Sequence, residues 1–153
     1  MSDRPLSVLM VNTSDLGGGA EQIAANMVRS YRASGMQVTF AVGKSRPNLG
    51  ESIPIRHSEY RSAWARAWSG LADRLSTSDG ASATINRLQR LMRGCLAEPR
   101  RWLHTKQGHE DFDFPGTGHL LSLPPAPPDV VHIHNMHGGY FDLRALSTIS
   151  RRV

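Results

Sequence analysis

Cysteine and long apolar runs are the first things that the sequence lacks. Its single cysteine, Cys95, excludes an internal disulfide. The amino-terminal apolar run, residues 6–11, is shorter than the ~7–15 residues of a secretory signal core and has no cleavage signal after it. No other run approaches the ~18–20 residues that cross a bilayer. We therefore expect a cytoplasmic protein.

Acidic residues are also scarce, with 13 Asp and Glu against 18 Lys and Arg and a formal charge of +5. Half of the basic residues fall between Arg61 and Lys106, where the acids are only Asp73, Asp79 and Glu98. This imbalance favours an anionic neighbour, but it does not choose among a phosphorylated ligand, a lipid headgroup and nucleic acid. A chain of 153 residues with 39% apolar residues is long enough for one globular domain.

The first third of the chain has the pattern of a β-α-β unit. Residues 7–12 are apolar and predict a strand. Residues 20–34 place apolar side chains at three- and four-residue spacing, which predicts a helix that ends at Gly35. Residues 37–42 alternate and predict a second strand. Two strands joined by a helix within this length pair in parallel.

The rest of the chain predicts further elements of the same kind. We expect a short strand at 52–55, helices at 61–75 and 83–97, an irregular stretch with four clustered prolines at 108–128, a buried strand at 130–134 and a helix at 140–151. The sequence thus predicts an α/β fold, a Rossmann-like parallel sheet with flanking helices.

Three consecutive glycines, Gly17, Gly18 and Gly19, lie between the first strand and the first helix. Without side chains, such a turn lets a phosphate or a sugar approach backbone N–H groups at the helix N-terminus. The alternative is that the glycines only make the turn tight. A dinucleotide role is not expected, because the GxGxxG spacing fails and the second strand ends in Val42-Gly43-Lys44 without an acid for a ribose.

A second polar loop follows the strand at 130–134. The histidines His132, His134 and His137 are spaced H-x-H-x-x-H, but no cysteine or carboxylate completes a zinc site within the motif. We expect His134 and Asn135 to bond a polar ligand and His132 to be a core histidine bonded to the backbone. If the strands are parallel, this loop and the glycine turn open on one edge of the sheet and form a cleft.

Two further patterns leave alternatives open. Trp64 and Trp68 beside arginines form either a core stripe, which we favour, or a contact with a membrane surface. The acids of the run Glu110 to Phe114 could act in acid/base catalysis. The interleaved phenylalanines instead favour an extended segment that packs its rings and leaves its acids solvated.

Three segments carry a family resemblance: VLMVNTSDLGGGAEQIAANM at 8–27, GHEDFDFPGT at 108–117 and PDVVHIHNMHGGYFDLRAL at 128–146. Together they resemble the amino-terminal region of family 4 glycosyltransferases, the retaining GT-B enzymes, particularly the branch that builds bacterial exopolysaccharide and colanic-acid-like chains. The resemblance implies that Gly17, Gly18 and Gly19, with Ala20 and Glu21, lie near the donor diphosphate. It places His134, Asn135, His137 and Tyr140 on the acceptor side.

The resemblance also implies what the rest of the enzyme contains. The intact enzyme would transfer a sugar from a nucleotide-sugar to a glycan or lipid-linked acceptor in cell-surface polysaccharide synthesis, at the inner face of the membrane and without a metal or other cofactor. This chain would be a truncated acceptor-side half, inactive alone, because the strand with a histidine–aspartate pair and the nucleotide-sugar domain are absent. The alternative is a non-catalytic binding module. Nucleic-acid binding is not expected, because no recognition motif is present.

Overall fold

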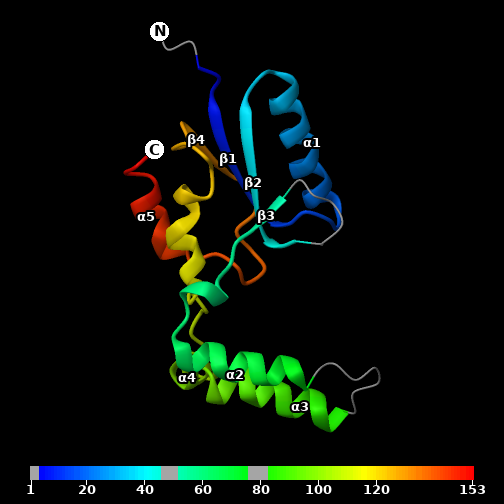
Figure 1. Ribbon diagram of the computed structural model, residues 1–153, viewed down its shortest axis with the longest axis vertical. Helices are drawn as coiled ribbons and strands as arrows, with labels where there is room; N and C mark the ends of the chain where they lie inside the picture. The colour runs from blue at the N-terminus through cyan, green and yellow to red at the C-terminus, as the bar shows by residue number, and fades with distance from the viewer. Residues whose placement is uncertain (1–3, 46–51, 76–82) are drawn as a thin grey trace. The chain divides into compact units, whose positions relative to one another are not determined.

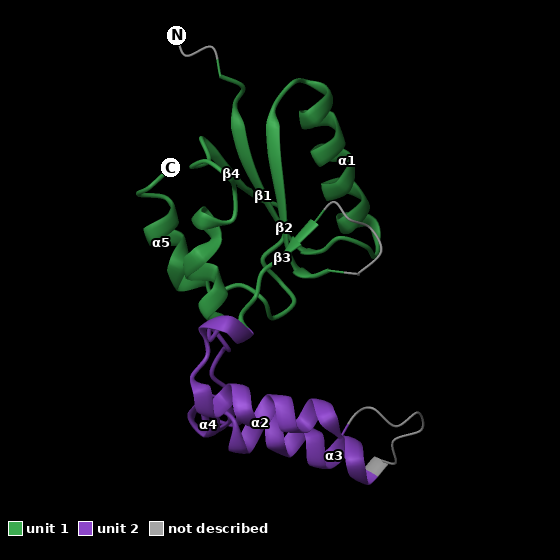
Figure 2. Cartoon of the chain, in the orientation of Figure 1, with its two compact units in different colours: residues 1–57, 114–153 green, residues 58–113 purple. Residues whose placement is uncertain are grey.

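The computed structural model describes residues 4–45, 52–75 and 83–153. The chain divides into two compact units, one formed by residues 1–57 and 114–153 and the other by residues 58–113 (Figure 2). We refer to them as the sheet unit and the helical unit. Within the described residues, no helix is long and apolar enough to traverse a bilayer.

Among the residues that the structure describes, the sheet unit has four parallel strands. They are β1 (Ser7–Ser14), β2 (Gln37–Lys44), β3 (Ser52–Pro54) and β4 (Val130–Ile133), in the order β3-β2-β1-β4. Val8 of β1 stands opposite Val38 of β2 on one side and Val130 of β4 on the other. The α/β class with a parallel sheet is therefore confirmed.

Alternate side chains of β1 pack into two apolar cores, one on each face of the sheet. On one face, Met10 packs with Phe40 and with Ala24 and Val28 of helix α1 (Gly19–Ala33). Helix α1 ends at Gly35, whose positive φ of 82° suits a residue without a side chain. On the other face, Leu9 and Val11 pack with carboxyl-terminal segments (Figure 1). These contribute Leu120, Tyr140, Phe141 and Ile149.

The carboxyl-terminal segments differ from their predicted form. The stretch expected to be irregular contains a 3₁₀ helix, Pro115–Ser122, which buries Leu120. The expected helix at 140–151 is confined to a 3₁₀ turn, Leu143–Ala145, and helix α5 (Leu146–Ile149). The reason is that Tyr140 and Phe141 are buried in the core before the helix begins, and the Asp142 carboxylate caps the N–H of Arg144 at 2.9 Å.

The helical unit contains a short 3₁₀ turn (Ser58–Tyr60), α2 (Ala63–Arg74), α3 (Ala83–Leu91), a π-helical turn (Met92–Leu96) and α4 (Pro99–Lys106). Helix α4 was not predicted. The interpretation of the tryptophan stripe as core was wrong, because Trp64 is 60% exposed. The side of α2 that packs is formed by Ala65 and Ala72, and α2 packs mainly against the π-helical turn rather than against α3.

Among the acids near the end of this unit, Glu110 and Asp113 are exposed as predicted, whereas Asp111 is partly buried in an ion pair, which corrects the prediction for that residue. Arg101 donates from Nε and Nη2 to the Asp111 carboxylate, at 2.9 and 2.6 Å, and from Nη1 to Glu98 at 2.8 Å. Glu98 also pairs with Arg61, which contacts Asp113 at 3.3 Å. Burial alone raises the pKa of Asp111, but the bonds from Arg101 and the Asp113 N–H outweigh it and lower that pKa below its usual value. These ion pairs leave no catalytic carboxylate pair there.

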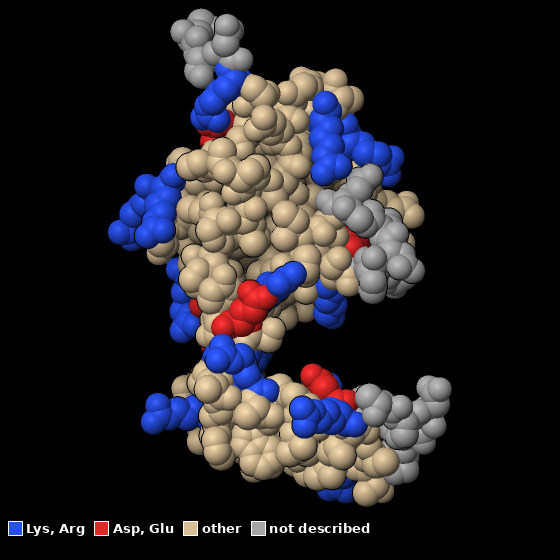
Figure 3. Space-filling model, viewed as in Figure 1, with Lys and Arg blue, Asp and Glu red and all other residues tan. Residues whose placement is uncertain are grey.

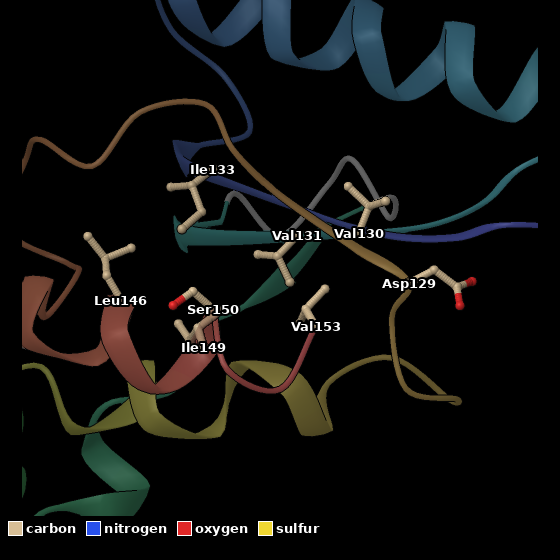
Figure 4. A pocket seen from close by; sticks show the side chains of 8 residues that line it. All are labelled: Asp129, Val130, Val131, Ile133, Leu146, Ile149, Ser150 and Val153. Atoms are coloured by element: carbon tan, nitrogen blue, oxygen red, sulfur yellow. The ribbon is translucent and has the colours of Figure 1, made fainter.

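Strand β4 forms one edge of the sheet, and an apolar cavity of about 450 Å³ runs beside it. In Figure 4, Val131 and Ile133 of β4 lie across this cavity from Leu146 and Ile149 of α5. A strand edge next to an apolar cavity has the surface that another strand covers in a wider parallel sheet.

We predict that the purified 153-residue chain self-associates through this edge. Val130, which is 42% exposed, lines the cavity, and Val130→Lys places a charge at the edge that opposes strand addition. Sedimentation velocity should show association of the wild-type chain and a shift toward monomer in the variant. Ile23→Lys, at an exposed position of α1, is the matched control. A wild-type chain that stays monomeric at high concentration contradicts the prediction.

Candidate functional site

The loops after β1 and β4 meet at the carboxyl edge of the sheet. Thr13, near the end of β1, donates from Oγ1 to the carbonyl of His137 at 2.7 Å. Gly138 lies so close that a Cβ there would be 2.7 Å from Thr13 Cγ2, and its φ is +103°. Both observations require glycine at this position. The loop after β4 is thus bonded to β1 at Thr13, four residues before the glycine turn.

The glycine turn itself does not need glycine for its own geometry. Gly17, Gly18 and Gly19 are not among the glycines with positive φ, and Gly18 has φ −78°. A Cβ on Gly19 would meet nothing within 4 Å, and one on Gly18 would touch only Glu21 at 3.7 Å. A tight turn therefore does not explain Gly18 and Gly19, whereas a Cβ on Gly17 would come within 3.0 Å of the Glu21 side chain. What Gly18 and Gly19 provide is uncovered backbone at the start of α1.

The N-terminus of α1 presents backbone donors to this space. Gly18 is the N-cap and has no side chain to accept a bond, and the first intrahelical bond runs from Gln22 N to Gly18 O at 3.2 Å. The N–H groups of Gly19, Ala20 and Glu21 thus have no partner within the helix. Together with the helix dipole they favour an anion. The Glu21 carboxylate stands over Gly17, so an anion would approach from the Gly19 side.

The loop after β4 is folded on itself. Asn135 Oδ1 accepts a bond from the His137 N–H at 3.0 Å, and the Tyr140 hydroxyl donates to the Asn135 carbonyl. His134 and Asn135 are partly buried, and His137 is exposed. The loop thus presents His134, Asn135 and His137 at the edge of the sheet. Tyr140 holds the loop in place through its bond to the Asn135 carbonyl.

Tyr140 is 2% exposed and packs against Gly43 at the end of β2, where a Cβ would come within 2.4 Å of the tyrosine. Burial raises the pKa of its hydroxyl well above the usual value, while a hydrogen bond with Thr13 opposes that rise. The hydroxyl therefore remains a neutral donor. Of the predicted site residues, Tyr140 is the one that the structure places in the core.

Asn12 near the end of β1 and Asp15 directly after the strand belong to the same edge, although neither was among the predicted site residues. Asp15 is buried, and its Oδ2 accepts bonds from Ser45 Oγ at 3.2 Å and Ser52 Oγ at 2.7 Å, which ties three strands together. Asn12 is fully buried and donates to the Ser14 carbonyl at 2.9 Å. Among the described residues, its Oδ1 has no hydrogen-bond partner. The available signal was a polar pair directly after an apolar strand.

His132 does not bond the backbone as predicted. Its Nδ1 is 3.1 Å from the hydroxyl of Tyr31 on α1, and its ring lies 6.2 Å from that of His134. The reason is the long reach of Tyr31, which extends from the last turns of α1 over the sheet. Burial, and then the proximity of His134, lowers the pKa of His132.

Within the part of the chain that the structure describes, no three His, Cys, Asp or Glu side chains gather closely enough to hold a metal ion. The cavity beside β4 contains none of the predicted site residues. Comparison with known proteins finds no matching family model, no matching curated protein and no matching solved structure. The chemistry of the edge is therefore the basis for any proposal of function.

We predict that Gly43→Ala destabilises the sheet unit by about 1–3 kcal/mol, because its Cβ would overlap the Tyr140 side chain in a packed core. Gly70→Ala in α2 is the control, since a Cβ there meets nothing and favours the helix by ~0.5–1 kcal/mol. Denaturant unfolding followed by circular dichroism measures both. A Gly43→Ala chain as stable as wild type contradicts the close contact.

A second prediction concerns pH. Because the folded pKa of His132 lies below the unfolded value of about 6.5, the unfolded chain binds more protons as pH falls from about 7 toward the folded pKa. The stability that neutral His132 contributes is thus present above about pH 7 and is lost as the pH falls through the folded pKa of His132. His132→Asn should flatten the decline in the free energy of unfolding. Parallel curves for wild type and His132→Asn would refute this.

Proposed function

We propose that this chain is the acceptor-side part of a glycosyltransferase of the GT-B type. The whole enzyme would move a sugar, with retention at the anomeric carbon, from a nucleotide-sugar to a glycan or lipid-linked acceptor in cell-surface polysaccharide synthesis. The parallel sheet supports the fold that this proposal needs. The reaction itself is supported by the resemblance of three sequence segments.

One structural observation carries the proposal. The backbone at Gly18 and Gly19 is uncovered although neither φ nor packing requires glycine, and it lies at an uncapped helix N-terminus on the carboxyl edge. That arrangement suits the diphosphate of a nucleotide-sugar, because uncapped N–H groups and the positive end of the helix dipole both stabilise negative charge.

In this proposal the glycine turn binds the donor and the loop after β4 binds the acceptor. The N–H groups of Gly19, Ala20 and Glu21 would bind diphosphate oxygens, and the Glu21 carboxylate, beside Gly17, would limit the anion to one approach. His134, Asn135 and His137 would bond hydroxyl groups of the acceptor. The Thr13 bond to His137 and the Tyr140 bond to Asn135 hold this loop in place. No residue here is assigned to bond breaking.

A second function is favoured by the edge of β4. The strand edge and its apolar cavity suit a non-catalytic interaction module that accepts an added strand. The two functions differ in ligand, since only the first requires an anion at the glycine turn.

We predict that UDP or pyrophosphate binds weakly at the glycine turn of this chain. With ¹⁵N-glycine labelling, the signals of Gly17, Gly18 and Gly19 should shift on titration. Gly18→Val should abolish the shifts, because the branched side chain fills the approach. Gly70→Val is the matched control in an open helical position.

His134→Ala should leave diphosphate binding intact, because the proposal places His134 on the acceptor side. Unshifted glycine signals at millimolar ligand, or binding that survives Gly18→Val, would overturn the donor-side assignment and leave the interaction module as the better account.

A further inference from the structure

The large apolar side chains of the helical unit are exposed to an unusual degree. On the helical pair α2 and α3 they are Trp64, Leu71, Leu75, Leu88 and Leu91. Helices of a small unit normally turn such residues inward, because burial of each large apolar side chain contributes to stability. Their exposure therefore indicates another surface that covers them.

Helix geometry places these residues on one face of the pair. Helices α2 and α3 are antiparallel, since Trp64 bonds to Leu96 and the Ala72 carbonyl accepts a bond from Gln89. Successive residues of a helix are rotated by about 100°, which puts Leu71 about 90–100° from Ala72. Leu88 is likewise rotated by about 100° from Gln89. Seen from one end of the pair, antiparallel helices rotate in opposite senses. The rotation of Leu71 away from Ala72 and that of Leu88 away from Gln89 therefore place both leucines on the same face of the pair.

The ion pair between Asp73 and Arg93 provides an independent check of this geometry. Asp73 is rotated by about 180° from Trp64 on α2, and its partner Arg93 lies in the π-helical turn that follows α3, so the face opposite Trp64 is the charged one. The pair is thus apolar on one face and polar on the other. Figure 3 shows the helical unit with a stretch of uncharged atoms bordered by Lys and Arg and, on one side, by acidic residues as well.

We propose that this apolar face, defined by Trp64, Leu71, Leu75, Leu88 and Leu91, docks on the surface of an anionic phospholipid bilayer. At ~14–18 Å, helices of this length are too short to span a membrane and would lie in its interface. Between Ala63 and Leu96 the sequence has five arginines against two aspartates, which complements anionic headgroups.

The position of the arginines favours a bilayer over a second copy of the chain. Arg74 and Arg87 fall at the outer margins of the apolar face by the same helical rotation, one on each helix. Two copies packed face to face would bring these margins together and oppose like charges. On a bilayer, the same margins meet phosphate groups while the leucines and Trp64 enter the acyl boundary. This inference does not depend on sugar transfer.

Tryptophan fluorescence gives a direct test with the full chain, because Trp64, Trp68 and Trp102 are its only tryptophans and all lie in the helical unit. Vesicles of phosphatidylcholine with about one third phosphatidylglycerol should bind the chain, blue-shift its emission and, when brominated, quench it. Vesicles of phosphatidylcholine alone should bind much less.

Matched variants locate the contact. Leu71→Gln combined with Leu88→Gln should lower vesicle partitioning at least about tenfold. Ile23→Gln, at a comparably exposed position of α1, should keep it. Arg87→Glu should weaken binding more than Arg152→Glu, although both change the net charge equally. Circular dichroism checks that each variant is folded.

Three outcomes overturn the proposal. The first is a folded wild-type chain that does not bind the anionic vesicles. The second is equal binding by the leucine variant and the Ile23→Gln control. The third is a wild-type dimer that the leucine variant disperses while neither chain binds vesicles, which would assign the face to contact between copies.

Discussion

The parallel pairing of β1 with a neighbour on each side is the constraint on which the sheet unit depends. Leu9, Met10 and Val11 are fully buried, and each face of β1 enters a different apolar core. Burial on both faces explains why β1 is a continuous apolar run, and the short helical crossover fixes its direction relative to β2. Because β2 and β4 run the same way, their following loops converge on the edge where β1 ends.

Much of this could be predicted from the sequence. The apolar strand at 7–12, the helical stripe after it and the alternating strand at 37–42 each carry a clear period, and a short crossover leaves only a parallel pairing. The glycine turn and the histidine strand were recognised because polar residues directly follow apolar runs. Their meeting point at Thr13 could not be predicted, because it depends on a contact between segments far apart in the chain.

The helical unit shows what hydrophobic periodicity cannot predict. A stripe indicates that a helix is amphipathic, but not which arc a neighbour covers. In α2 the covered arc belongs to Ala65 and Ala72, which lie toward the π-helical turn, and Trp64 is left outside. Helix α4 was missed because polar residues dominate it, and Arg101, paired with Glu98 and Asp111, joins it to the segment that follows. The Glu98–Arg101 pair has the i,i+3 spacing of a helix, but the pair with Asp111, ten residues further on, has no periodic signature.

The contact between Gly43 and Tyr140 restricts how these two positions can change during evolution. With so little space between the end of β2 and the tyrosine ring, neither position can drift alone. A lineage that gains a side chain at position 43 must first, or soon after, lose bulk at position 140. The two positions should thus vary as a linked pair among homologues. A distant sequence that keeps a tyrosine after the double glycine but has a large residue at the end of its second strand must arrange that edge differently.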